Sequence, residues 1–126
     1  MNIEEFRAYC LSLPMVEESM PFDEVTLVMK VGGKIFALAG TVGFDHFAVK
    51  SDPEVSLVLR ERYEAVQGAF HLNKKHWSDV YVDRDMGGEL LRRQILDSYE
   101  LVVAKSVTPK ALRIEIQALY AAWRGA

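Results

Sequence analysis

The fold is decided by the stretch Val25-Thr26-Leu27-Val28-Met29-Lys30-Val31-Gly32-Gly33-Lys34-Ile35-Phe36-Ala37-Leu38-Ala39. Every second residue from Val25 to Val31 is apolar, which is the period of a strand with one well-buried face. Gly32-Gly33 then supplies the two positive-φ positions that a tight hairpin requires. We therefore predict that residues 34–39 return as a second, antiparallel strand.

Further strands and helices are predicted on both sides of this hairpin. After a turn at residues 40–43, the alternation of residues 46–50 predicts a third strand, and residues 63–66 and 78–83 are predicted as a fourth and a fifth. Helices are predicted over residues 3–13, from residue 53 to about residue 62, over residues 89–105 and after Thr108-Pro109. The order is α-β(3)-α-β(2)-α with an extra C-terminal helix, which is typical of a two-layer α+β fold with an antiparallel sheet.

Local signals set the bounds of these elements. Asn2 followed by Glu5 has the form of a relaxed capping box, and Pro14 ends the first helix. The run Ser51-Asp52-Pro53-Glu54 is a helix start in which Ser51 is predicted to be the cap. The spacing of Val55, Val58, Leu59 and Arg62 predicts that a short helix follows. Residues 15–24 are predicted to be a surface connection from which Phe22 reaches the edge of the core.

The last predicted helix carries an apolar stripe. Its members Leu112, Ile116, Leu119 and Trp123 follow one another at four-three-four spacing, which resembles a heptad pattern. A stripe of this kind either seals one end of the monomer or joins two subunits. Self-association through the C-terminal helix is therefore one of the expected interactions.

Length and composition predict one soluble domain over residues 1–126. The chain is 50% hydrophobic and 26% charged, which is near the globular average. We expect a cytoplasmic protein that does not enter a membrane, because the first 15 residues lack a signal-peptide pattern and no apolar run approaches ~20 residues. The single cysteine, Cys10, lies on the apolar side of the first helix and is expected to be a core residue.

Charge is distributed unevenly along the chain. The net charge is −3, which argues against a surface adapted throughout to nucleic acid. Residues 1–24 hold six acidic side chains against one basic side chain, so the remainder of the chain is slightly basic. A positive face away from the N-terminus is compatible with this distribution.

The densest group of polar and aromatic side chains is His71-Leu72-Asn73-Lys74-Lys75-His76-Trp77. Lysines and an amide can hold phosphate oxygens while an imidazole or an exposed ring stacks on a base, as in binders of nucleic acid that tolerate many sequences. A solvated basic turn followed by a core tryptophan is the plainer explanation of the same residues. His71 and His76, with Asp79 and Asp83 nearby, have a spacing that disfavours a metal site.

Signals for catalysis are missing from the sequence. A G-x-S-x-G nucleophile elbow and a phosphate-binding glycine loop are both absent, and the two Gly-Gly pairs are explained by turn geometry. No acid-base pair can be assigned from spacing. We therefore expect a protein that is not an enzyme and needs no cofactor.

The chain resembles the MmcQ/YjbR family of small bacterial proteins along nearly its whole length. The resemblance rests on residues 29–37, on residues 49–54, on the segment His71–Trp77 and on residues 98–102. It implies an α-β(3)-α-β(2)-α fold, similar to that of type III secretion chaperones and described as a double-wing DNA-binding architecture. The positions that match the family pattern are Lys34, Lys50, Asn73, Lys74, His76 and Trp77.

Two functions follow as expectations. The first is DNA or other nucleic-acid binding without catalysis, and the second is a protein-interaction or chaperone-like module that receives a partner segment. The residues assigned to nucleic-acid binding are Lys34, Lys50, Asn73, Lys74, Lys75, His76 and Trp77.

Overall fold

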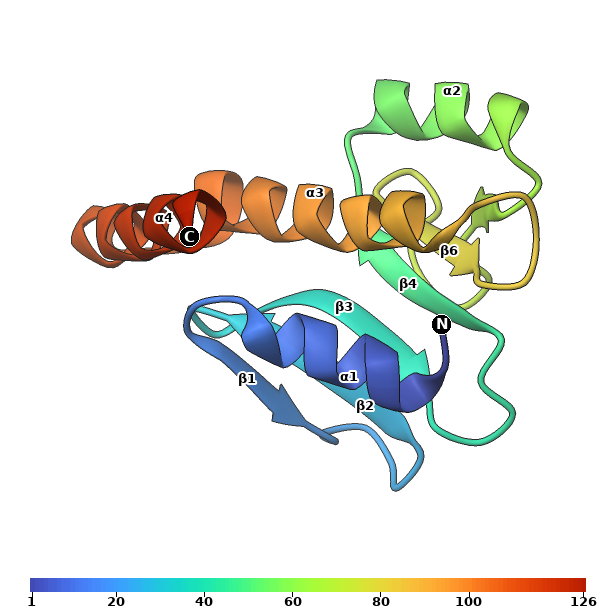
Figure 1. Ribbon diagram of the computed structural model, residues 1–126, viewed down its shortest axis with the longest axis horizontal. Helices are drawn as coiled ribbons and strands as arrows, with labels where there is room; N and C mark the ends of the chain where they lie inside the picture. Colours follow the sequence, from blue (N-terminus) through green and yellow to red (C-terminus); the bar gives the residue numbers. More distant parts are fainter.

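The computed structural model describes residues 1–126 as four helices and a six-stranded antiparallel sheet (Figure 1). The α+β class is confirmed. The strand order across the sheet is β1-β2-β3-β4-β6-β5, so β1 and β5 form the two edges. The elements are α1 (Ile3–Ser12), β1 (Val16–Ser19), β2 (Thr26–Val31), β3 (Lys34–Gly40), β4 (His46–Lys50), α2 (Pro53–Arg62), β5 (Val66–Gly68), β6 (Trp77–Tyr81), α3 (Gly88–Ser106) and α4 (Lys110–Gly125). None of the helices combines the length and the apolar character that crossing a membrane requires.

The predicted central hairpin is present. Strands β2 and β3 pair in antiparallel register, and Gly32 and Gly33 have φ angles of 57° and 77° in the turn. The turn also packs closely, because a Cβ added to Gly32 would lie 2.8 Å from Cγ1 of Val107. Gly32 therefore serves both the left-handed turn and the contact between the hairpin and the end of α3.

Residues 15–24 contain a strand that the sequence did not predict. Residues 16–19 form β1, which pairs with β2 along its whole length. The sequence did not indicate this strand because two of its four residues are glutamates. One of them, Glu18, faces α1, where its carboxylate accepts a hydrogen bond of 2.6 Å from Nε of Arg7. The prediction that Phe22 reaches the core is wrong, since its side chain is 66% exposed.

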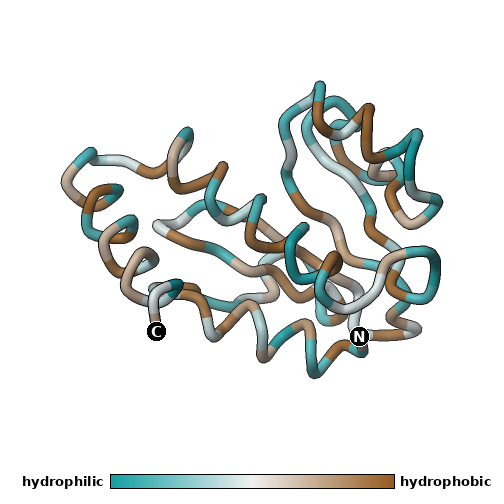
Figure 2. Tube along the Cα trace, turned by 45° about the horizontal axis from the view of Figure 1, so that its top comes forward, coloured by the Kyte–Doolittle hydropathy of each residue, from teal (hydrophilic) through white to brown (hydrophobic).

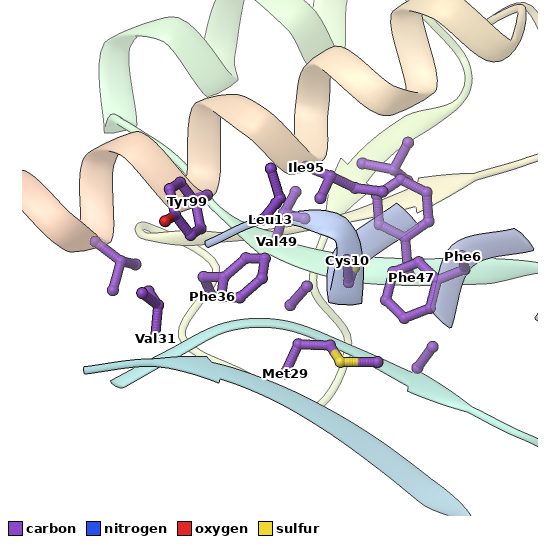
Figure 3. Packing of buried hydrophobic residues seen from close by; sticks show 14 of the residues in the cluster. Phe6, Cys10, Leu13, Met29, Val31, Phe36, Phe47, Val49, Ile95 and Tyr99 are labelled. Atoms are coloured by element: carbon purple, nitrogen blue, oxygen red, sulfur yellow. The ribbon is translucent and has the colours of Figure 1, made fainter. Parts of the chain in front are cut away.

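The core lies between one face of the sheet and the helices α1 and α3. The ring of Phe6 in α1 stacks on Phe47 in β4 at 5.2 Å, and Phe36 in β3 meets Tyr99 in α3 edge-on at 5.4 Å. Figure 3 shows these rings lying between the helices and the strands. Cys10 is fully buried as predicted, and burial raises the pKa of its thiol.

Helix α2 stands apart from the other helices, at the top of Figure 1. Its N-cap is Asp52 rather than the predicted Ser51, because the Asp52 carboxylate accepts the N–H groups of Glu54 and Val55. Of the apolar residues that the sequence places in this helix, Leu59 packs on the core, whereas Val55 and Val58 are exposed and Ser56 is buried instead. Hydrophobic residues recur along α2 in the hydropathy colouring of Figure 2.

The remaining strands and the last helix are close to their predicted places. The fourth strand begins at Val66 rather than at Tyr63, because the N–H of Tyr63 still bonds to Leu59 at the end of α2. In α4, Ile116 is buried but Leu119 is 44% exposed. Tyr120 takes the inner position, and Trp123 packs on Tyr120 and on Tyr9 of α1. Most of the predicted stripe thus packs within the chain.

Candidate cationic site

The loop between β5 and β6, residues 69–76, is held in place by hydrogen bonds from its own residues and from α2. Asn73 Oδ1 accepts the N–H of Lys75 at 2.9 Å, and the Asn73 carbonyl accepts the N–H groups of His76 and Trp77. Nη2 of Arg60 donates to the Lys74 carbonyl at 2.7 Å, to the Trp77 carbonyl at 3.1 Å and to Ser78 Oγ at 3.0 Å. Asn73 therefore shapes the turn, and Arg60 fixes the loop against α2.

The lysines of this loop remain in solvent. Lys74 and Lys75 are exposed, although the carbon stem of Lys74 lies at 3.5 Å from the position that a Cβ on Gly68 would take. Trp77 is half-buried at the start of β6, where it is paired with Lys50 of β4. A lysine whose stem packs on the protein while its ammonium group faces water keeps its charge available to a ligand.

A pocket of about 220 Å³ lies where β4, α2, the loop and the end of α3 meet. We call it the basic pocket, and it is lined by Lys50, Ser51, Asp52, Pro53, His76, Leu101, Lys105 and Ser106. The N–H of Ser51 donates to the His76 carbonyl at 2.8 Å, which ties the start of α2 to the end of the loop. Side chains from four separate parts of the chain thus converge on one hollow.

The electrostatics of the basic pocket favour an anion. The carboxylate of Asp52 is engaged in capping the first turn of α2, so it offsets the two lysines only in part. The N-terminus of α2 adds the positive end of a helix dipole. Two polar groups are also left without a partner: Ser51 Oγ is buried and unbonded, and the His76 ring makes no hydrogen bond within the chain.

The predicted site residues are therefore brought together in part. Lys50 and His76 line the basic pocket, and Asn73, Lys74, Lys75 and Trp77 lie in or directly beside the adjoining loop. Lys34 does not line the pocket, because it starts β3 at the far side of the hairpin turn. The turn before Lys34 contacts Val107, which lies two residues after Lys105. Lys34 and the pocket therefore both lie near the C-terminal end of α3. No group of three or more His, Cys, Asp or Glu side chains is arranged to hold a metal ion.

Comparison with known proteins places this chain within a family. The model of the YjbR family matches residues 11–101, which is most of the chain. The chain belongs to the YjbR family. A relative named uncharacterized protein YbdF, from Escherichia coli O157:H7, is 41% identical over 101 residues, covering 79% of this chain and 83% of the relative. Uncharacterized protein YjbR of Escherichia coli strain K12 is 32% identical over 104 residues, covering 82% of this chain and 88% of the relative.

Solved structures agree with the YjbR fold. The crystal structure of a Deinococcus radiodurans protein with the family-model domain DUF419 superimposes with a TM-score of 0.83 at 36% identity, covering 92% of this chain and 88% of that one. A Pseudomonas syringae protein superimposes with a TM-score of 0.68 at 24% identity, covering 80% of this chain and 98% of that one, and so supports the fold.

Only some of the residues that line the basic pocket lie within the YjbR match. Lys50 and His76 lie inside the matched residues, whereas Lys105 and all of α4 lie beyond them. Sequence reasoning missed Lys105, which is one basic residue in the last turn of a long helix. The only sequence signal for Lys105 is its position in the last turn of the helix, where the helix dipole stabilises a cation. No sequence pattern links Lys105 to Lys50.

Proposed function

We propose that this YjbR-family protein binds nucleic acid, DNA in the first instance, without catalysing a reaction. One observation carries the proposal: Lys50 from β4, His76 from the loop and Lys105 from α3 line the same pocket. Two lysines that line one hollow are suited to phosphate oxygens, and an unbonded imidazole beside them is suited to a sugar or a base.

The exposed lysines around the basic pocket extend its positive charge. Lys74 and Lys75 precede His76 directly, and both are exposed. The acidic N-terminal segment lies elsewhere: β1, with Glu17 and Glu18, is separated from β4 by the two strands β2 and β3. The overall charge of −3 therefore does not describe the surface around the basic pocket.

Fluorescence anisotropy of a labelled DNA duplex and a labelled single strand tests this proposal. At about 50 mM salt and micromolar protein we expect binding that weakens steeply as salt is raised, because bound phosphates release counterions. Lys50→Gln and Lys105→Gln should each weaken binding and reduce the slope of log affinity against log salt by about one.

Arg92→Gln is the matched control. It removes one positive charge from an exposed position on the same helix as Lys105, roughly 20 Å away along the axis at 1.5 Å per residue. Binding unaffected by Arg92→Gln but weakened by Lys50→Gln supports the pocket. No salt-sensitive binding, or equal losses in all three variants, contradicts it.

A second candidate function is protein interaction, in the form of self-association through α2. It is supported by the exposure of Val55 at 52%, Leu57 at 63% and Val58 at 60% on a single helix. Light scattering over a range of concentrations tests it against a Val58→Glu variant. A mass above that of the monomer that is lost in the variant supports this function, and a monomer at every concentration contradicts it.

A further inference from the structure

The outer face of the sheet carries a second hollow, separate from the basic pocket. In β4, Phe47 and Val49 belong to the core, so His46 and Ala48 project from the opposite face. A pocket of about 600 Å³ opens on this face between β2 and β6. We call it the sheet-face pocket and define it by Leu38, His46, Phe70, His71, Asp79 and Tyr81.

The shape of the sheet-face pocket is set by small residues under it and aromatic residues around it. Ala48, which is 6% exposed, lies between Leu38 and Asp79 in the strand register. Phe22 borders the hollow from the β2 side and Phe70 from the β6 side, and their side chains are 66% and 76% exposed. Apolar rings held in water beside a hollow of this volume are typical of a ligand site.

One buried charged group lacks sufficient partners. Asp79 is 6% exposed, and its carboxylate accepts a single hydrogen bond, from the N–H of Phe70 at 3.2 Å to Oδ2. No lysine or arginine forms an ion pair with it. A buried carboxylate normally has several hydrogen bonds or a cationic partner. Asp79 Oδ1 is therefore free to accept a hydrogen bond from a bound ligand.

The other charged groups around the sheet-face pocket are already engaged. The Asp23 carboxylate accepts the N–H groups of Val25 and Thr26, and Asp45 contacts Nδ1 of His46 at 2.6 Å. The guanidinium of Arg84 lies 3.8 Å from the centre of the Tyr81 ring and donates to the Glu64 carbonyl. No lysine or arginine lines the hollow, so a phosphate is repelled there rather than attracted.

We propose that the sheet-face pocket binds a small organic cation, a protonated amine attached to a flat aromatic or apolar body. The amine donates to Asp79 Oδ1, and the body lies over Ala48 and Leu38 between Phe22 and Phe70. This ligand class goes beyond nucleic-acid binding and uses different residues.

Tryptamine and indole-3-propionate are suitable probes, because they share the indole and carry opposite charges. Titration of each into the full chain, followed in two-dimensional amide NMR spectra at neutral pH, should show tryptamine binding with shifts on β3, β4, β6 and residues 69–72. Indole-3-propionate should bind about tenfold more weakly or not at all. Equal binding of the two probes, or no shifts with millimolar tryptamine, overturns the proposal without the need for any variant.

Two substitutions test the assigned roles. Asp79→Asn keeps an oxygen to accept the N–H of Phe70 but removes the charge, so it should weaken tryptamine binding about tenfold or more. Asp83→Asn, an exposed acid shortly after β6, is the matched control and should change nothing. Ala48→Leu fills the base of the sheet-face pocket. It should weaken the binding of tryptamine and of 3-ethylindole, an uncharged probe with the same ring, to a similar degree.

The results also separate this proposal from nucleic-acid binding. Unchanged tryptamine affinity in both Asp79→Asn and Ala48→Leu overturns the sheet-face pocket as the site. DNA binding should survive Asp79→Asn, and tryptamine binding should survive Lys105→Gln, since the two hollows share no lining residue. Each proposal therefore stands or fails by itself.

Discussion

The two faces of the sheet use the same strands in opposite ways. On the inner face, Phe47 stacks at 5.2 Å on Phe6 and is completely buried. On the outer face, the next residue, Ala48, lies beneath an open hollow of about 600 Å³. Because side chains alternate along a strand, one five-residue strand contributes both to the core and to the sheet-face pocket. Substitutions at neighbouring positions are thus expected to affect stability in one case and binding in the next.

The largest expected effect is the contrast between Phe47→Ala and Leu38→Ala. Removing the Phe47 ring leaves a cavity in the core and should lower the free energy of unfolding by about 3–5 kcal/mol. Leu38 is only half-buried on the outer face, so its truncation should cost about 1 kcal/mol or less. Urea unfolding of both variants measures the difference. Similar losses contradict the distinction between the two faces.

The hairpin turn provides the next test, because Gly32 packs closely against Val107 at the end of α3. Gly32→Ala combines a left-handed φ with a Cβ at 2.8 Å from Val107, so it should lower the free energy of unfolding by about 2–4 kcal/mol. Gly33→Ala has a similar φ but open space around its Cβ, and should cost about 1–2 kcal/mol. Adding Val107→Ala to Gly32→Ala should recover part of the loss if the close contact is its cause.

Arg60→Met tests whether the loop of residues 69–76 serves both hollows. The Arg60 guanidinium donates hydrogen bonds to three oxygens of the loop and of β6. Loss of these hydrogen bonds should lower the free energy of unfolding by about 1–3 kcal/mol. We also expect weaker DNA binding and weaker tryptamine binding, although Arg60 lines neither pocket.

Arg62→Met is the control for this substitution. Arg62 lies in the same last turn of α2 but is exposed and bonds to no loop oxygen. If both variants leave the two affinities unchanged, the loop is not positioned by Arg60.

The smallest effect concerns Asp85, which lies outside both hollows. Hydrogen bonds from the N–H groups of Ala65 and Glu64 hold the pKa of its carboxyl below the usual range. A depressed pKa in the folded state adds stability above the pKa of the unfolded chain, about 3.9, and this stability disappears as pH falls through the folded value.

Asp85→Asn should therefore lower the melting temperature at neutral pH, and the difference from the wild type should shrink in acid. Asp83→Asn is the matched control, because Asp83 is an exposed acid two residues away. A difference for Asp85→Asn that is constant with pH would point to lost packing instead.

Local patterns predicted most of the fold. The capping box of Asn2 and Glu5 and the left-handed glycines at 32 and 33 are in the structure as the sequence indicated, because each depends on neighbours along the chain. The inner side of α3, with Leu91, Ile95 and Tyr99, is also buried as expected.

Features set by distant neighbours were not predictable in this way. The sequence of β1 has the composition of an acidic loop, and it forms a strand because it pairs with β2. Val58 is exposed because no helix packs on its side of α2. The meeting of Lys105 with Lys50, and the position of Asp79 opposite Ala48, depend on how α3 and β6 dock on β4. The sequence therefore named Lys50 and His76 as candidates but could not show that they line one pocket, and it missed Lys105.

The shortness of the outermost strands has a consequence for how this protein meets other molecules. Strand β1 has four residues, two of them glutamates, and β5 has three. Exposed strand edges otherwise invite pairing with a neighbouring chain and growth into aggregates. With so few free backbone groups at either edge, a second chain has little ladder to extend, so pairing by strand addition is disfavoured at both edges.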